Sequence, residues 1–306
     1  MQYPVLQNLF AGGGLIIALI AVVHVYVAQF AVGGGLYLVL TEHLARRRNS
    51  EALLEHVRRH TLFFLLLTMV FGSLTGVAIW FVIAVLSPGA TLTLIHNFSF
   101  GWATEWVFFV GEIVTLLVYH YTFRTMDART HLTVGWLYFA FGWLSLFIIT
   151  GITGLMLTPG AWLQTGDFWD GFFNPSFWPQ VVFRTLVAFG VAGLFAFLTA
   201  VREKDPEVCE TVARFSAVWT IAPLILLIPA GRWYLAALPA AQRGMVLGGN
   251  PEIAPYVEAI LGLLPILIAG GLLMALRQPR PIRVALAAVL LLLGLAHFGS
   301  FEFIRE

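Results

Sequence analysis

Eight long apolar stretches constrain this chain more than any other feature of its sequence. A membrane-spanning helix needs about 20 consecutive, mostly apolar residues, and eight segments meet that requirement. They cover roughly residues 9–41, 61–86, 98–123, 132–157, 178–201, 212–237, 254–276 and 283–302. The charged clusters fall between these segments, and no polar stretch is long enough for a separate soluble domain. The sequence therefore predicts an all-α, polytopic integral membrane helix bundle, with residues 1–306 forming a single transmembrane domain.

The composition agrees with this interpretation and excludes other classes of protein. Charged residues make up 11% of the chain and hydrophobic residues 59%, whereas soluble domains are about 25% charged. A soluble enzyme or a nucleic-acid-binding protein is therefore excluded. The single cysteine, Cys209, lies among charged residues and has no second cysteine to pair with. The chain also lacks the Cys-x-x-Cys-His motif that attaches c-type haem covalently.

The positive charges predict the orientation of the chain in the membrane. Thirteen of the 17 Lys and Arg residues lie in the connections after the first, third, fifth and seventh spans. Cytoplasmic loops carry the excess of Lys and Arg, so we expect both termini to face outward. No basic residue and no small-residue cleavage site precedes the first apolar stretch, which we interpret as an uncleaved span. The expected location is a bacterial inner membrane.

Some residues within the predicted spans are unusual for a lipid environment. Three consecutive glycines at 33–35 in the first span predict bending or close contact between helices. Ionisable side chains at membrane depth are costly and usually have a partner or a function. Six are predicted there, namely His24, Glu105, Glu112, Arg184, Glu258 and His297.

Glu105 and Glu112 form the first candidate site. They are seven residues apart, or two helical turns, so both face the same side of the third span. Such a pair can carry protons or hold a cation. The alternative is that each carboxyl is simply protonated, or bonded to a neighbouring helix, and has no catalytic role.

His24 and His297 are the candidate metal ligands. Each is an imidazole in an apolar stretch, which in a soluble core would indicate a structural histidine. At membrane depth, in a chain rich in glycine and aromatic residues, an iron ligand is the favoured interpretation. Haem requires a neutral imidazole on its iron and apolar walls around the ring. The histidines expected instead to be solvated, or to contact lipid headgroups, near the basic side are His43, His56, His60 and His131.

The order of these residues resembles subunit I of the cytochrome bd quinol oxidases. His24 occupies the position of that family's haem-ligating histidine in the first span. The stretch Gly72-Ser73-Leu74-Thr75-Gly76 resembles its Gly-x-x-Thr-Gly motif in the second span. Glu105 and Glu112 resemble its two glutamates in the third span, although the family spaces them eight residues apart.

The resemblance continues over the fourth span and weakens toward the end of the chain. The segment from Gly142-Trp143-Leu144-Ser145 to Met156 and Pro159 resembles the family's fourth span, and Asn174-Pro175 precedes the fifth span as in the family. The resemblance implies that Trp143 and Met156 contribute to cofactor binding. The resemblance also aligns His297 with a glutamate that is a haem ligand in a late span of the family. A histidine ligand would then replace the glutamate ligand in this chain.

Other positions depart from the family pattern. Arg184 stands in the place of the histidine that holds the family's low-spin haem, and the seventh span has no methionine at the matching position. The long quinol loop is reduced to the short stretch between Pro239 and Pro255. Because Arg184 and Glu258 have opposite charges at similar depth, we hypothesise that they form an ion pair in the space of the missing haem.

The sequence thus predicts a haem-b-binding membrane subunit related to bd-type oxidase subunit I. His24 and His297 would hold one haem or two, with haem d not indicated. Electrons would arrive from a c-type cytochrome or a quinol, and a second membrane subunit is expected. Oxygen reduction, with Glu105 and Glu112 supplying protons, and electron relay without oxygen chemistry remain open.

A haem-free transporter or structural membrane subunit is the rival prediction. Its support is the cluster of buried charges formed by Arg184, Glu258 and Glu105. The sequence shows no internal repeat and no pair of broken helices related between its halves, features that many transporters carry.

Overall fold

A computed structural model describes residues 13–277 and 279–305 of the chain. Within these residues, eight helices are long and apolar enough to cross a membrane, and every predicted span coincides with one of them. Residues 9–12 of the first predicted span lie outside the described part. The spanning helices are α1 (Gly13–Arg47), the continuous α2 (Glu51–Leu65), η1 (Leu66–Gly72) and α3 (Ser73–Leu86), then α5 (Ser99–Tyr121), α6 (Ala128–Gly154), α9 (Phe177–Ala200), α10 (Pro206–Ala237), α12 (Ala254–Ala275) and α13 (Arg280–Arg305).

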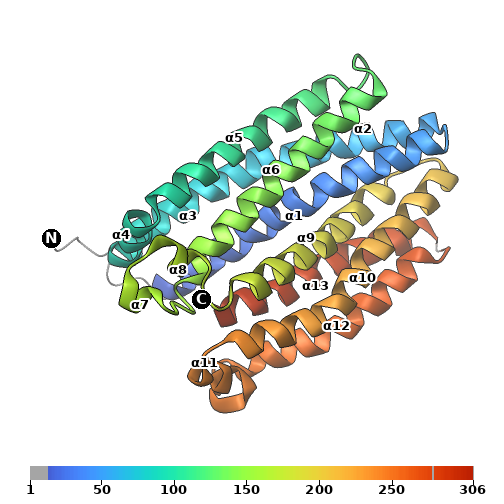
Figure 1. The fold of residues 1–306 in the computed structure, drawn as a ribbon. Coiled ribbons are helices and arrows are strands. Elements are labelled where there is room, and N and C mark those ends of the chain that lie inside the picture. Colours follow the sequence, from blue (N-terminus) through green and yellow to red (C-terminus); the bar gives the residue numbers. More distant parts are fainter. Residues whose placement is uncertain (1–12, 278, 306) are drawn as a thin grey trace.

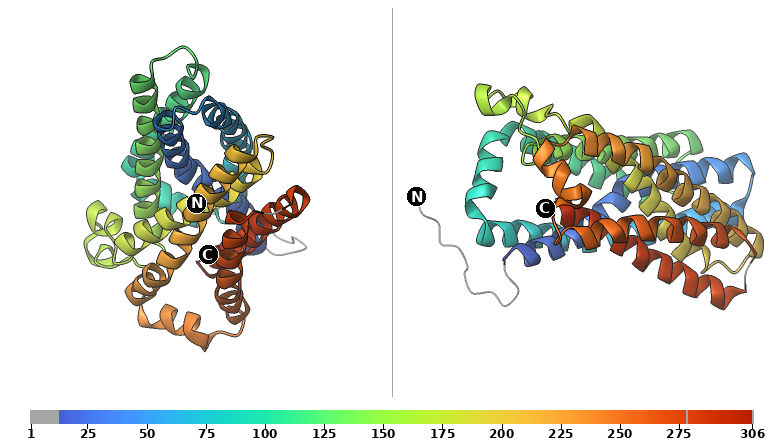
Figure 2. Two further views of the ribbon diagram at one scale, coloured as in Figure 1. Left: turned by 90° about the vertical axis from the view of Figure 1, so that its right-hand side faces the viewer. Right: turned by 90° about the horizontal axis from the view of Figure 1, so that it is seen from below.

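The spanning helices form two groups that meet at the centre of the molecule (Figure 1). One group contains α1, α2–α3, α5 and α6, and the other contains α9, α10, α12 and α13. Helices α1 and α9 pack against each other and join the groups, as the end view in Figure 2 shows. Helix α1 begins and α13 ends at the same end of the bundle (Figure 1). We call this the outer end, following the predicted orientation, and the opposite end the inner end.

Short helices lie at the outer end. They are α4 (Pro88–Asn97), α7 (Trp162–Thr165), α8 (Phe168–Phe172), α11 (Ala240–Gly244) and the π-helical η2 (Met245–Gly249). Helix α8 and its flanks are rich in aromatic rings, which are enriched where a membrane meets water. Helix α11 and η2 occupy the short connection from α10 to α12.

Polar caps start the helices at the inner end and explain why these helices extend beyond the apolar stretches. The Ser50 hydroxyl accepts a hydrogen bond from the Leu53 amide at the start of α2. Asp127 accepts from two amides at the start of α6, and Asp205 does so for α10. These side chains satisfy amides that lack intrahelical partners. Each of the three helices therefore begins several residues before its predicted span.

The three glycines in the middle of α1 allow close packing with several neighbouring helices. A Cβ at Gly33 would clash with the carbonyl of Ala188 on α9, and one at Gly35 would clash with the ring of Tyr138 on α6. A Cβ at Gly34 would likewise clash with the ring of Phe64 on α2. The predicted close contact between helices is therefore confirmed at this point.

Replacing Gly33 by Ala should destabilise the bundle by about 1–3 kcal/mol or more, the usual cost of overpacking. The clash is with backbone, which cannot turn aside as a side chain can. Gly14 is a matched control on the same helix, because no described atom outside its own stretch of helix lies within 4 Å of a Cβ built there. Thermal unfolding in detergent should show a lower midpoint for Gly33→Ala than for Gly14→Ala. Equal midpoints would contradict the prediction, because they would show that α1 and α9 can move apart at this point without loss of stability.

Candidate functional site

His24 is held in a defined orientation by α3. Its Nδ1 lies 3.2 Å from the Thr75 hydroxyl. That hydroxyl donates its own hydrogen to the carbonyls of Phe71 or Gly72, each 3.0 Å away. The Thr75 oxygen therefore accepts a hydrogen from Nδ1, and Nε2 of the neutral ring keeps its lone pair. This is the tautomer that a metal ligand bonded through Nε2 requires.

The backbone of the second spanning helix makes room for this imidazole. A Cβ at Gly76 would lie 3.1 Å from Cε1 of His24, closer than an ordinary contact. The π-helical segment η1 ends at Gly72, three residues before Thr75, and π-helical turns occur frequently at functional sites. The Gly-x-x-Thr-Gly motif thus supplies both the orienting hydroxyl and the space for the ring.

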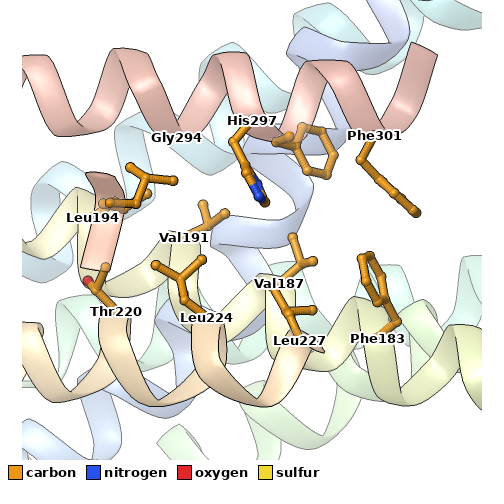
Figure 3. Close-up of a pocket in the computed structure, with 13 residues that line it drawn as sticks. Phe183, Val187, Val191, Leu194, Thr220, Leu224, Leu227, Gly294, His297 and Phe301 are labelled. Carbon is orange, nitrogen blue, oxygen red and sulfur yellow. The ribbon is translucent and has the colours of Figure 1, made fainter. Parts of the chain in front are cut away.

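His297 points from α13 into an apolar cavity of about 40 Å³. Figure 3 shows its imidazole directed toward side chains of the facing helices α9 and α10. Its Nε2 is buried and has no hydrogen-bond partner within the described residues. The rings of Phe183 and Phe301 also line the cavity, with their centroids 4.6 Å apart. The surroundings are therefore apolar and aromatic around one unpartnered ring nitrogen.

His24 points away from α13, the helix that carries His297. Val22 and Tyr26 face α13, since Val22 contacts Gly299 and the rings of Tyr26 and Phe298 are 5.5 Å apart. Successive helical residues are rotated by about 100°, which places His24 about 160° away from both of these residues. His24 accordingly contacts α3. The geometry therefore favours two separate ligand sites over one group shared by both rings.

A series of polar contacts runs along the interface of the antiparallel helices α5 and α6. The Ser145 hydroxyl donates to Glu105 over 2.7 Å, and the Tyr138 hydroxyl donates to Glu112 over 2.9 Å. Seven residues further along α5, the ring of Tyr119 stacks on that of His131, with centroids 4.2 Å apart. The spacing is seven residues on both helices, so the three contacts share one face. We call these contacts the polar ladder, with an outer, a middle and an inner rung.

The middle rung can hold a proton on either partner. The Tyr138 hydroxyl lies 2.9 Å from Glu112 and 3.0 Å from the carbonyl of Ala31. When Glu112 is ionised, Tyr138 donates to it. When Glu112 is protonated, the carboxyl can donate to Tyr138, which then donates to Ala31. Both protonation states of this buried carboxyl therefore have a hydrogen-bond partner.

The inner rung is a buried cluster around Glu42 of α1. Its carboxylate accepts hydrogen bonds from Tyr119, over 2.5 Å, and from Arg46, over 2.6 Å. Nδ1 of His131 lies 3.0 Å from both carboxylate oxygens, and Nε2 lies 2.9 Å from the carbonyl of Tyr119. Glu42 and His131 have no exposed surface. The cluster joins α1, α5 and α6 at the inner end.

A tightly packed region separates the inner rung from the middle rung. Residues from α1, α5 and α6 line it, and it has no room for a water molecule. They are Gly35, Leu38, Val39, Leu116, Tyr119, Gly135 and Tyr138. Water can join the two rungs only when these side chains move.

Comparison with known proteins identifies the family of this chain. The sequence model described as cytochrome bd terminal oxidase subunit I matches residues 15–243. The chain belongs to this family. Membership confirms the predicted resemblance and makes the chain a multi-pass membrane subunit of a respiratory oxidoreductase. Comparison with curated protein sequences gives no significant match.

The fold of a bd oxidase is conserved over nearly the whole chain despite low sequence identity. A chain of the bd oxidase from Geobacillus thermodenitrificans superimposes with a TM-score of 0.78 at 17% identity. The match covers 95% of this chain and 84% of the other. The eight-span fold is therefore that of a bd oxidase chain.

The two ligand positions fit the haem of a bd-type subunit by their chemistry. His24 has an oriented Nε2 lone pair, and His297 has a buried, unpartnered Nε2 among aromatic rings. Both imidazoles match the requirement for a neutral ring nitrogen, and the walls around His297 are apolar as haem requires. No three His, Cys, Asp or Glu side chains gather as a metal cage in residues 13–277 and 279–305. Side chains fill most of the space beside His297, so haem binding there requires some of the residues that line the cavity to move.

Trp143 and Met156, also predicted to bind the cofactor, are not among the described residues that line the cavity at His297. The Trp143 indole donates to the hydroxyl of Thr185, 3.1 Å away on α9. Met156 follows the end of α6, and 54% of its surface is exposed. Their part in cofactor binding stays a prediction.

The predicted ion pair between Arg184 and Glu258 is wrong. Arg184 is buried on α9, whereas Glu258 on α12 is exposed. No ion pair among the described residues includes Glu258 or Glu105. The hydropathy of the sequence indicates how deep a residue lies in the membrane but not which face of its helix it occupies. The prediction of this ion pair used depth and charge alone and was therefore wrong. The cluster that supported a haem-free transporter is therefore not formed.

Three histidines expected at the surface are buried instead. His56, His60 and His131 are at most 1% exposed, while His43 is exposed as expected. They lie where α2 and α6 continue inward beyond the apolar stretches and still pack against the bundle. His56 contacts Glu203 in the connection between α9 and α10. Burial opposes ionisation of Glu203, yet hydrogen bonds from His56 and Arg59 lower the pKa of its carboxyl.

Cys209, which was expected in a charged loop, is also buried. It lies in the first turns of α10.

Proposed function

We propose that this chain is the haem-b-binding subunit of a bd-type oxidase, with His24 and His297 each holding one haem. The observation that carries the proposal is the geometry at His24, where Thr75 fixes the tautomer that leaves Nε2 free. The orphaned Nε2 of His297 supports the second position. Haem supplies, when bound, the redox-active iron to which electrons and oxygen are delivered.

Thr75→Val should weaken haem binding at His24 by about 10–100-fold, the usual effect of removing a group that orients a ligand. Valine keeps the shape of threonine but cannot accept the hydrogen of Nδ1. The measurement is haem released per chain on titration with a competing haem-binding protein. Thr104→Val on α5 is a control, because its exposed hydroxyl only bonds the carbonyl of Phe100 on its own helix. Equal haem retention in both variants would remove Thr75 from the site.

We propose that the polar ladder carries protons from the inner end to the haem region. Its support is the regular spacing of the rungs and the two bonded states of Glu112. Glu42, Tyr119 and His131 form the entry, Tyr138 and Glu112 the middle, and Glu105 with Ser145 the exit. Transfer between the inner and middle rungs requires water to enter the packed region between them.

Of the two predicted electron donors, the comparisons lend no support to a c-type cytochrome, and we propose a quinol. The purified oxidase should consume oxygen with a reduced short-chain quinol and not with reduced cytochrome c. Oxygen uptake with cytochrome c alone would reverse this assignment. Absence of uptake with both donors, in a sample that contains haem and does not bind carbon monoxide, would indicate electron relay without oxygen chemistry.

A second membrane subunit is proposed as the partner of this chain. Helices α3 and α5 expose large apolar side chains along much of their length, including Leu74, Val77, Phe81, Trp106 and Val107. Such faces suit lipid or another helical subunit equally. Mild-detergent purification of the untagged complex from membranes, followed by mass determination, distinguishes a single chain from a heteromer.

A further inference from the structure

Two buried histidines at the inner end of α2 take no part in the site described above. His56 and His60 are four residues apart on one helix, so they share a face. Each is 1% exposed. Their rings are nearly parallel, with centroids 6.0 Å apart and an angle of 18° between the planes. The pair lies between α1, α2 and the end of α9.

Both rings are oriented through Nδ1. Nδ1 of His60 lies 2.8 Å from the hydroxyl of Thr199, which donates its own hydrogen to the carbonyl of Ala196. The Thr199 oxygen therefore accepts from Nδ1, and Nε2 of His60 keeps its lone pair. Nδ1 of His56 lies 2.8 Å from the carboxylate of Glu203, which orients this ring in the same way.

The two Nε2 atoms have no partner. Both are buried, and neither has a hydrogen bond in the described part of the chain. Buried polar atoms are almost always bonded to protein, water or an ion, and each exception needs an explanation. The two exceptions belong to neighbouring rings on one face of α2, whose centroids are 6.0 Å apart.

We propose that His56 and His60 bind a transition-metal ion that prefers imidazole nitrogen, with Zn²⁺ as the representative. Histidines at positions i and i+4 of a helix are a recurrent pair of zinc ligands. Metal-bound histidines almost always donate their other N–H to a carboxylate, carbonyl or similar acceptor, as these two do to Glu203 and Thr199. The nearby carboxylate of Glu203 also offsets part of the charge of the ion.

The geometry requires a small adjustment. An ion about 2.0–2.1 Å from each Nε2 in tetrahedral geometry holds the two ring centroids about 5 Å apart. Because the centroids are now 6.0 Å apart, binding one ion brings the rings about 1 Å closer and turns both Nε2 atoms toward the ion. Within the described residues no third His, Cys, Asp or Glu completes a cage, so water fills the remaining positions, or Glu203 does so by turning from His56. Arg59, which is half-exposed, donates to Glu203 over 2.6 Å, so this carboxylate lies close to the inner surface.

Zinc content of the untagged, haem-containing protein tests the proposal. After treatment with a chelator, the protein is incubated with Zn²⁺, freed of excess metal and examined by elemental analysis. We expect one zinc per chain in the wild type and in His43→Ala, whose histidine is exposed at the same end. His56→Ala and His60→Ala should retain none, and Thr199→Val should bind about 10–100-fold more weakly. Co²⁺ in place of Zn²⁺ should give the visible absorption of a tetrahedral site.

The proposal fails if the wild type retains no zinc, in which case a bridging water is the partner of both Nε2 atoms. It also fails if His56→Ala retains as much zinc as His43→Ala. Haem content and gel-filtration profile show whether each variant is folded. If His60→Ala does not fold, Thr199→Val decides the question, because it leaves both imidazoles in place. Unchanged zinc affinity in that variant overturns the assignment.

Discussion

Glu112→Gln is expected to lower steady-state oxygen consumption by about 10²-fold or more, the usual contribution of a positioned proton-transfer group. The amide keeps the size of the side chain and can still bond Tyr138, which now lies 2.9 Å from the carboxylate. It cannot, however, take up and release a proton. Oxygen uptake with quinol as donor is the measurement, and haem content should stay at the wild-type level.

Two further variants make this result specific to the polar ladder. Glu258→Gln removes an exposed carboxyl on α12 that forms no ion pair with the described residues, and it should leave the rate unchanged. Tyr138→Phe breaks the relay to Ala31 and should slow turnover less than Glu112→Gln, because the carboxyl remains. Wild-type turnover in Glu112→Gln would exclude the ladder as the proton route.

Glu42→Ala is expected to destabilise the protein by about 3–5 kcal/mol, the cost of breaking a buried ion cluster by removing one partner. The carboxylate accepts from Tyr119, Arg46 and His131 at once, and alanine leaves all three without it. Thermal unfolding in detergent should show a markedly lower midpoint.

The matched control for Glu42 is Glu55, which also pairs with arginines at the inner end. Its side chain is 32% exposed and bonds Arg58 and Arg124 near the surface. Pairs of this kind contribute only about 0–1 kcal/mol, so Glu55→Ala should change the midpoint little. If the two variants unfold at the same temperature, the buried cluster does not stabilise the inner end of the bundle.

The spans were predictable because lipid imposes a simple requirement of length and hydrophobicity on each helix. The same requirement says little about where a helix continues beyond the lipid. Asp127 caps α6 before its apolar stretch begins, and His131 in its first turn is therefore packed inside the bundle. The signal that could have revealed this was the seven-residue spacing of Tyr119 from Glu112 on one helix and of His131 from Tyr138 on the other.

Part of the candidate site was recognisable from the sequence, whereas the partners of its charged residues were not. His24, Thr75 and Gly76 were recognisable as a pattern, and the structure explains that pattern by one hydrogen bond and one close contact. The partner of Glu258 was not predictable, because charge and depth do not determine which face of α12 turns outward. The burial of His56 and His60 depends on contacts with Thr199 and Glu203, more than a hundred residues away in the sequence.

A reduced-minus-oxidised visible spectrum of the purified protein, with and without carbon monoxide, tests the central claim most directly. Two haems held at His24 and His297 predict a b-type spectrum that loses a distinct part in His24→Ala and another part in His297→Ala. A shift on addition of carbon monoxide is expected for an open iron position. A folded wild-type sample without haem absorption, or a His24→Ala spectrum identical to that of the wild type, would contradict the proposed haem sites.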